Sequence, residues 1–233
     1  MKKLIITVLT SIMLTSSAAM AGSYAIGAKL SNAFIDASGT ETTTAGDVTG
    51  GAANTNSASV SNDMVLIPSI YAEYMLDSSV WGSEGNEITF GINYTFGEAD
   101  VSDKVKRRQE SAEDADGNGS SGSMTYDAQA SIENYMNYYV EIPLASALYA
   151  KAGFSQLDVI TEEDADHEGS YGNATLDGTN FGIGLKGMTG NYSWKIAYEV
   201  TDWDSLSLTS TTSNKIAADL DVDELSLSVG YRF

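Results

Sequence analysis

Leu225-Ser226-Leu227-Ser228-Val229-Gly230-Tyr231-Arg232-Phe233 decides the fold of this 233-residue chain. Apolar and polar residues alternate along it without a break, and it ends on an aromatic residue. A period of two is typical of a β-strand with one face in an apolar medium. Such a strand needs a partner on both edges, and in a membrane a closed barrel is the only β arrangement that supplies them. The stretch therefore predicts a β-barrel.

The same alternation recurs upstream and predicts an all-β chain, an antiparallel up-and-down transmembrane barrel of eight strands. We expect these strands at 24–35, 62–76, 87–97, 129–144, 147–159, 178–188, 191–203 and 219–233. The connections after the second, fourth and sixth strands are short (Asp77–Asn86, Ala145-Ser146 and Thr189-Gly190), and the other four are long and acidic. Outer-membrane barrels keep short turns in the periplasm and long loops outside, so both termini are expected in the periplasm. Pro68 and Pro143 each remove a ladder donor and are expected to mark a bulge or a strand end.

The amino terminus has the features of a secretory signal peptide. Lys2-Lys3 is followed by an apolar run from Leu4 to Leu14 and by Ala19-Met20-Ala21, a small-residue cleavage site. The apolar run is too short for a membrane helix, which needs about 20 residues. We expect residues 1–21 to be removed and 22–233 to form the barrel. The absence of cysteine excludes disulfides and cysteine-based metal sites.

Two readings of the alternating faces are possible, a membrane barrel and a secreted soluble barrel with the opposite phase. Small polar residues dominate one face, and aromatic residues gather near one end of the other, which indicates an interfacial girdle in a membrane. The residues of this expected girdle are Tyr24, Tyr74, Tyr192, Trp194, Tyr231 and Phe233. The pattern therefore favours the membrane barrel.

The charged residues of the strands fall on the polar face, and their charges cancel. An eight-stranded barrel has an interior just wide enough for side chains to fill it. Cancelling charges therefore predict an interior plug of ion pairs, whereas a selective charged pore would carry an excess of one sign. The residues expected in the plug are Lys29, Glu73, Glu87, Glu133, Glu141, Lys151, Lys186, Lys195, Glu199 and Arg232.

The formal net charge is −20, and most of it falls in the four long connections. This sign disfavours nucleic-acid binding. Asp114, Asp116, Asn118 and Gly119 fit part of a calcium-loop motif, but its twelfth position is Thr125. A flexible acidic loop that binds Ca²⁺ or Mg²⁺ weakly is the alternative that we favour, and no other cofactor is expected.

Two further clusters carry possible chemistry. Lys104-Val105-Lys106-Arg107-Arg108 could clamp a lipopolysaccharide phosphate or pair with neighbouring carboxylates. His167, Glu168 and Ser170 could serve an outer-membrane lipid-modifying enzyme, but a triad is weak because the chain has one histidine. We therefore expect a non-catalytic protein.

The terminal strand also resembles the assembly signal that the barrel-assembly machinery reads in outer-membrane proteins. Ser226, Tyr231 and Phe233 match that pattern, whereas Ser228 stands where Gly is usual. Over its mature length the chain resembles the small eight-stranded outer-membrane proteins of the OmpA, OmpX and opacity-protein type, without a peptidoglycan-binding domain. The resemblance implies a role in membrane integrity and surface contact, including adhesion, with lipid and lipopolysaccharide around the barrel and an unknown surface ligand. A small-solute channel of the OmpW type is the alternative.

Overall fold

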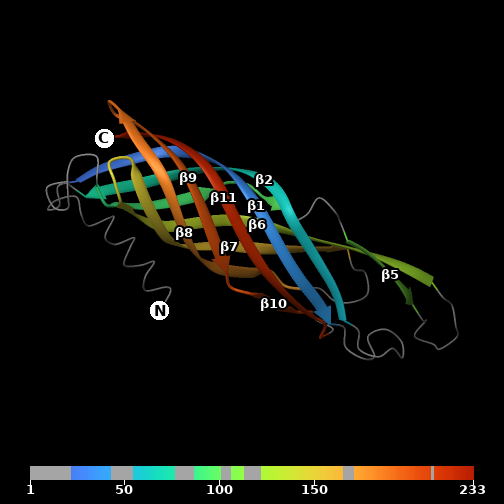
Figure 1. The fold of residues 1–233 in the computed structure, drawn as a ribbon. Coiled ribbons are helices and arrows are strands. Elements are labelled where there is room, and N and C mark those ends of the chain that lie inside the picture. Colours follow the sequence, from blue (N-terminus) through green and yellow to red (C-terminus); the bar gives the residue numbers. More distant parts are fainter. Residues whose placement is uncertain are drawn as a thin grey trace.

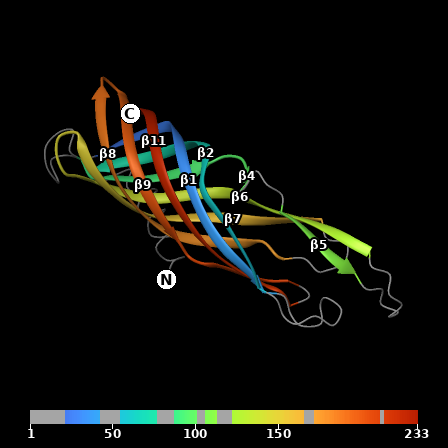
Figure 2. The same cartoon turned by 45° about the vertical axis from the view of Figure 1, so that its right-hand side comes forward.

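The computed structural model describes residues 22–42, 55–76, 87–100, 106–112, 122–164, 171–210 and 213–233. They form one antiparallel sheet that closes on itself (Figures 1 and 2). The wall consists, in order, of β1 (Gly22–Thr42), β2 (Thr55–Leu76), β3 (Thr89–Thr95), β6 (Gly122–Pro143), β7 (Leu148–Asp164), β8 (Ala174–Thr189), β9 (Tyr192–Trp203) and β11 (Lys215–Arg232). Pairing of β11 with β1 closes the circle. The predicted eight-stranded barrel is confirmed, while the expected signal peptide, 1–21, lies outside the described residues.

Three short strands continue members of this wall. β4 (Ala99–Asp100) and β5 (Lys106–Ala112) follow β3 and pair with β6, and β10 (Leu206–Thr209) follows β9 and pairs with β11. The hairpin of β5 and β6 projects beyond the rest of the wall (Figure 1). Much of the sequence expected to form long loops is therefore strand. Among the described residues, no helix is long and apolar enough to cross a membrane.

One end of the barrel, which we call the turn end, carries the short connections. Residues 144–147 join β6 to β7, and Gly190-Asn191 joins β8 to β9, with Gly190 at a φ of 60° that favours glycine. The backbone N–H of Phe233 donates to the Tyr24 carbonyl (2.8 Å), so both described ends meet there.

Pro143 ends its strand as predicted, whereas Pro68 lies inside β2 opposite Leu30 of β1 and marks neither a strand end nor a bulge. Pro143 is the last residue of β6. Pro68 lies one residue beyond Ser69, where the described pairing of β2 with β3 stops. The expected short connection 77–86 lies outside the described residues.

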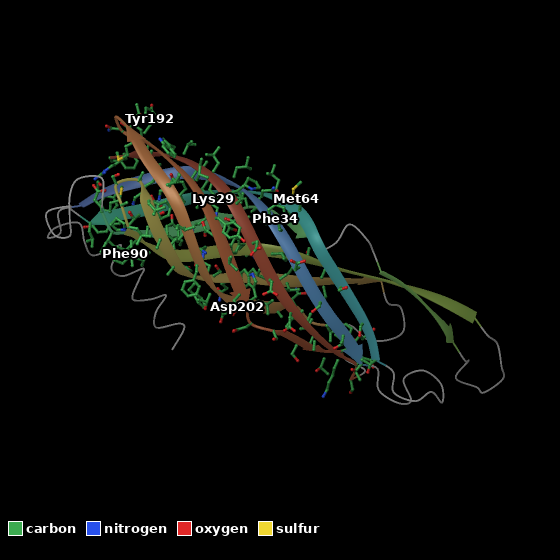
Figure 3. The ribbon with its side chains drawn as sticks, viewed as in Figure 1. Lys29, Phe34, Met64, Phe90, Tyr192 and Asp202 are labelled. Atoms are coloured by element: carbon green, nitrogen blue, oxygen red, sulfur yellow. The ribbon has the colours of Figure 1, made fainter. Side chains whose placement is uncertain are left out.

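Near the turn end the outer face of the wall is apolar. Side chains along β9 alternate between exposed and buried, with Trp194, Ile196, Tyr198 and Val200 outside. Tyr192, labelled at the turn end of β9 in Figure 3, is 68 % exposed and lies edge-on to Tyr231. This apolar exterior has the phase of a membrane barrel, not that of a soluble one.

The predicted aromatic girdle needs one correction. Tyr24, Tyr192, Trp194, Tyr231 and Phe233 are exposed, as a lipid interface requires. Tyr74 is only 2 % exposed, because its ring lies against Tyr24 (5.1 Å between centroids) and over Gly22.

Toward the other end, the loop end, the polarity of the two faces inverts. On β11, Leu225, Leu227 and Val229 are exposed, whereas Leu220 and Val222 pack inside. Asp219 and Asp221, which alternate with them, are exposed. The ladder between β1 and β11 runs from Ala25↔Arg232 to Thr42↔Lys215 without a shift, so the backbone keeps its phase and only the chemistry changes. We call the inverted wall, residues 215–223 of β11 and the strands beside it, the collar.

Inside the collar the side chains form a small hydrophobic core. Leu157, Val159, Leu176 and Trp203 are buried at its centre and are called the apolar layer below. Tyr135 lies edge-on to Trp203, with 5.8 Å between ring centroids. The barrel therefore has a membrane-type half at the turn end and a soluble-type half at the loop end.

Candidate functional site: the closed interior

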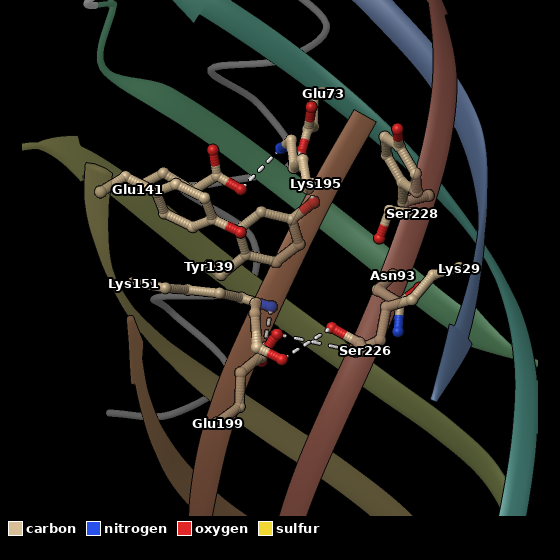
Figure 4. Close-up of a pocket in the computed structure, with 13 residues that line it drawn as sticks. Lys29, Glu73, Asn93, Tyr139, Glu141, Lys151, Lys195, Glu199, Ser226 and Ser228 are labelled. Carbon is tan, nitrogen blue, oxygen red and sulfur yellow. Dashed lines mark hydrogen bonds and ion pairs between the residues drawn. The ribbon is translucent and has the colours of Figure 1, made fainter. Parts of the chain in front are cut away.

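The interior of the membrane-type half is filled by charged side chains. Figure 4 shows them converging from opposite walls of the barrel. All the residues predicted for the plug except Glu133 lie inside and belong to two ion-pair clusters and a pair at the rim. We keep the name plug for these interior charges.

The first cluster surrounds Glu73. Lys195 from β9 pairs with Glu73 of β2 and with Glu141 of β6, the latter at 2.6 Å between Nζ and Oε1. Lys186 of β8 reaches Glu141 from the other side at 3.4 Å. The Tyr139 hydroxyl donates to Glu73 at 2.6 Å. Side chains from four strands thus meet around two carboxylates.

The second cluster surrounds Glu199 and lies closer to the collar. Lys151 donates to its carboxylate at 2.6 Å, Lys29 lies 3.7 Å from it, and the Asn180 amide donates to it at 3.3 Å. Lys29 also pairs with Glu224 of β11. The Lys151 ammonium lies 3.9 Å from the centroid of the Tyr139 ring, so a cation–π contact joins this cluster to the first.

A third pair lies at the mouth of the turn end. Arg232 and Glu87 are 3.1 Å apart, and the arginine side chain is 24 % exposed. Next to this pair is a cavity of about 130 Å³, which we call the vestibule, bordered by Met75, Met188 and Lys186. Glu73 and Lys195 form its inner boundary and close it toward the centre.

Glycines opposite large aromatic residues make room for this packing. Gly91 is the direct cross-strand partner of Tyr139, and Gly184 is that of Tyr149. A Cβ at either glycine would overlap the facing ring, so the tyrosines can lie flat against the wall only because these side chains are missing. Small residues on the polar face were visible in the sequence, but their pairing with the tyrosines depends on strand register.

Little free space remains in the centre. The gap between the two clusters is about 20 Å³, enough for one water molecule but not for a continuous water column. Above it the apolar layer fills the barrel with hydrocarbon side chains. The interior is therefore closed twice, first by paired charges and then by a hydrophobic core.

Glu133 is the one wrong assignment among the predicted plug residues. It is paired with Asp158, which alternates with the buried Leu157 and Val159 and therefore lies on the outer face. A bulge between Glu133 and Met136 contains Asn134 at a φ of 52°, and this extra residue reverses the strand parity.

Glu224 belongs to the plug and was missed. It is 5 % exposed and pairs with Lys29. It shares the parity of Ser226 and Ser228 in the expected strand 219–233, so strand alternation was a signal that could have found it. When Glu224 takes the place of Glu133 in the list of plug residues, the interior charges still cancel. The positive residues are Lys29, Lys151, Lys186, Lys195 and Arg232, and the negative ones are Glu73, Glu87, Glu141, Glu199 and Glu224.

Other candidate residues have different placements. Asp114, Asp116 and Asn118 of the calcium motif, and His167, Glu168 and Ser170, lie outside the described residues. Lys106, Arg107 and Arg108 are the first three residues of β5 in the projecting hairpin, and Lys104 is outside the described residues. Of the expected assembly signal, Ser226 is buried, and Tyr231 and Phe233 are exposed neighbours with ring centroids 5.5 Å apart.

Comparison with known proteins gives similarity to outer-membrane barrels only at the level of solved structures. No family model matches the chain, and no curated protein matches it. Among solved structures, the attachment invasion locus protein Ail of Yersinia pestis is 12 % identical, with a TM-score of 0.44 and coverage of 92 % of this chain and 100 % of that one.

Two other structures give similar values. Neisserial surface protein A is 13 % identical, with a TM-score of 0.41 and coverage of 90 % and 97 % of the two chains. The outer membrane protein OprG of Pseudomonas aeruginosa is 9 % identical, with a TM-score of 0.42 and coverage of 92 % and 97 %. At these values, no ligand, activity or partner is transferred to this chain.

Proposed function

We propose that this protein is a closed outer-membrane β-barrel with a structural and surface-contact role and no catalytic activity. The observation that carries the proposal is the double closure of the interior. Paired charges fill the membrane-type half, and the apolar layer fills the collar. A barrel closed in this way offers its outer surfaces to other molecules and not its lumen.

The exterior supports a contact role. The wall carries a band of exposed apolar side chains near the turn end, as the lipid-facing belt of outer-membrane barrels does. We place the turn end in the periplasm and the collar outside, so that lipopolysaccharide surrounds the base of the collar. Asp36, Asp202 and Asp221 are cross-strand neighbours on its outer face, which favours loose association with Ca²⁺ or Mg²⁺ and disfavours nucleic acid.

Assembly by the barrel-assembly machinery and contact with a surface ligand complete the proposal. The exposed aromatic residues Tyr231 and Phe233 at the turn end support the former. The projecting hairpin of β5 and β6 supports the latter, because it extends past the wall and offers backbone edges to solvent (Figure 2).

Single-channel recording in planar bilayers tests the closed lumen. We expect no stable openings from the unmodified protein. We also expect none from Lys195→Met, since the apolar layer remains intact in that variant. Leu157→Ser combined with Lys195→Met weakens both barriers and is expected to raise the frequency of openings. Stable, high-conductance openings from the unmodified protein would refute the proposal.

A small-solute channel is the second candidate, and the vestibule favours it. This cavity of about 130 Å³ reaches Lys195 and Glu73 from the turn end, so half of a solute path already exists. Under this alternative, displacing the Glu73 cluster alone would open the barrel. Openings from Lys195→Met as frequent as those from the double variant would therefore favour the channel.

A further inference from the structure

The small space at the centre of the plug has an unusual wall residue, Asn93 of β3. Asn93 is 1 % exposed, and its cross-strand partners are Tyr71 on one side and Asn137 on the other. Neither its Nδ2 nor its Oδ1 atom has a protein hydrogen-bond partner. The neighbouring Asn137 differs in its NH₂ group, because its Nδ2 donates to the Ser155 hydroxyl at 2.8 Å and only its Oδ1 has no protein partner.

An asparagine buried in this way needs a partner that both donates and accepts hydrogen bonds. Unpaired buried amide groups are costly, and native proteins pair them with protein groups or with ordered water. The space that Asn93 borders is about 20 Å³, and the hydroxyls of Ser226 and Ser228 also line it (Figure 4). This volume accepts a single water molecule and is too small for an organic ligand.

The charges around this space select a neutral occupant. The lining contains Lys29, Lys151 and Lys195 together with Glu73, Glu141 and Glu199, so its formal charges cancel. All six are already in ion pairs. A bound anion or cation would therefore have to displace an existing partner, whereas a water molecule adds hydrogen bonds without disturbing any pair.

We propose that one water molecule is bound at Asn93 as a fixed part of the plug. It accepts a hydrogen bond from the Asn93 amide and returns one to the Asn93 carbonyl oxygen or to a neighbouring side chain. Its exchange route leads to the vestibule, since Glu73 and Lys195 border both spaces, while the apolar layer closes the opposite side. The site is independent of whether the barrel conducts.

Nuclear magnetic resonance of the refolded, ¹⁵N-labelled protein in lipid nanodiscs tests the site. We expect a cross peak between a long-lived water and the Asn93 side-chain NH₂ group. No such peak is expected at Asn137, a buried control whose amide is bonded to Ser155. Absence of the Asn93 peak in the folded protein would overturn the proposal, as would a peak of equal strength at both residues.

Two further measurements separate water from an ion and from a packing effect. Exchanging sodium chloride for choline chloride or sodium sulfate should leave the Asn93 resonances unshifted, and a titratable shift would indicate a bound ion instead. In crystals, a density peak within hydrogen-bond distance of the Asn93 amide should disappear in Asn93→Leu, which has a similar volume and no polar atoms. A peak that remains in this variant would contradict the role of Asn93. The resonance test uses the unmodified protein and stands if the variant does not fold.

Discussion

Replacing Glu224 by Gln tests the assignment of the plug most directly, with Glu133→Gln as the matched control. Both variants remove one carboxylate charge from a strand. Glu224 is buried against Lys29, whereas Glu133 lies on the outer face opposite Asp158. Strand parity without the bulge would place both carboxylates inside, so a large loss in Glu224→Gln alone distinguishes the observed register from the simple one.

The expected loss of unfolding free energy depends on the ion-pair partner that Lys29 keeps in Glu224→Gln. Removing one partner of a buried ion pair costs about 3–5 kcal/mol, since it leaves a charge uncompensated. Lys29 retains Glu199 at 3.7 Å, so we place the cost of Glu224→Gln at the lower end, about 3 kcal/mol. Glu133→Gln removes an outward-facing carboxylate beside Asp158 and should change the free energy of unfolding by about 0.5 kcal/mol or less.

Urea unfolding of the refolded proteins in lipid nanodiscs, followed by tryptophan fluorescence, measures both effects. With a urea slope of about 3 kcal/mol per M, Glu224→Gln should lower the midpoint by roughly 1 M. The slope should stay unchanged, and the heat-modifiable gel shift should show that both variants are folded. A loss in Glu133→Gln as large as that in Glu224→Gln would refute the assignment of the two faces.

Two other substitutions test the packing. Gly91→Val should displace Tyr139 and break its bond to Glu73, at a cost of about 2 kcal/mol or more in urea unfolding, while Gly172→Ala, which has open space around it, should be close to neutral. Trp203→Ala should lower the free energy of unfolding by about 3–5 kcal/mol, because Trp203 is buried in the hydrophobic core of the collar. The control Phe181→Ala, on the lipid face, should lower it by about 2 kcal/mol or less because lipid refills the gap. Equal losses in the two variants would contradict a packed core.

Alternation was sufficient to predict the strands and their faces wherever lipid and polar interior oppose each other. It placed Lys29, Glu73 and Glu199 correctly, because a strand without irregularities turns position in the sequence directly into a face. It could not show which lysine meets which glutamate. That depends on strand tilt and stagger around the whole barrel, which no local pattern contains.

The two errors in the plug have separate physical causes. The assignment of Glu133 was wrong because the bulge at Asn134 adds one residue and reverses the strand parity. Asparagine tolerates the left-handed conformation that the bulge needs, but an asparagine in a strand does not by itself predict a bulge. Glu224 was missed because Leu220-Asp221-Val222-Asp223 alternates with the opposite phase, as in a soluble barrel. This acidic stretch lies within the expected strand 219–233, and Glu224 stands where the phase of the apolar residues changes.

The unbroken ladder between β1 and β11 has a mechanical consequence. β1 has 21 residues, and at about 3.3 Å per residue and a tilt of about 40° they rise roughly 50 Å along the barrel axis. An apolar belt of about 25 Å accounts for half of that height. The rest stands clear of the hydrocarbon, joined to the embedded half by continuous hydrogen bonds and without a hinge along this ladder. A molecule that bound the rim would therefore be held at a fixed height above the membrane. A force on the rim would pass through continuous strands to the half of the barrel that lies in the bilayer.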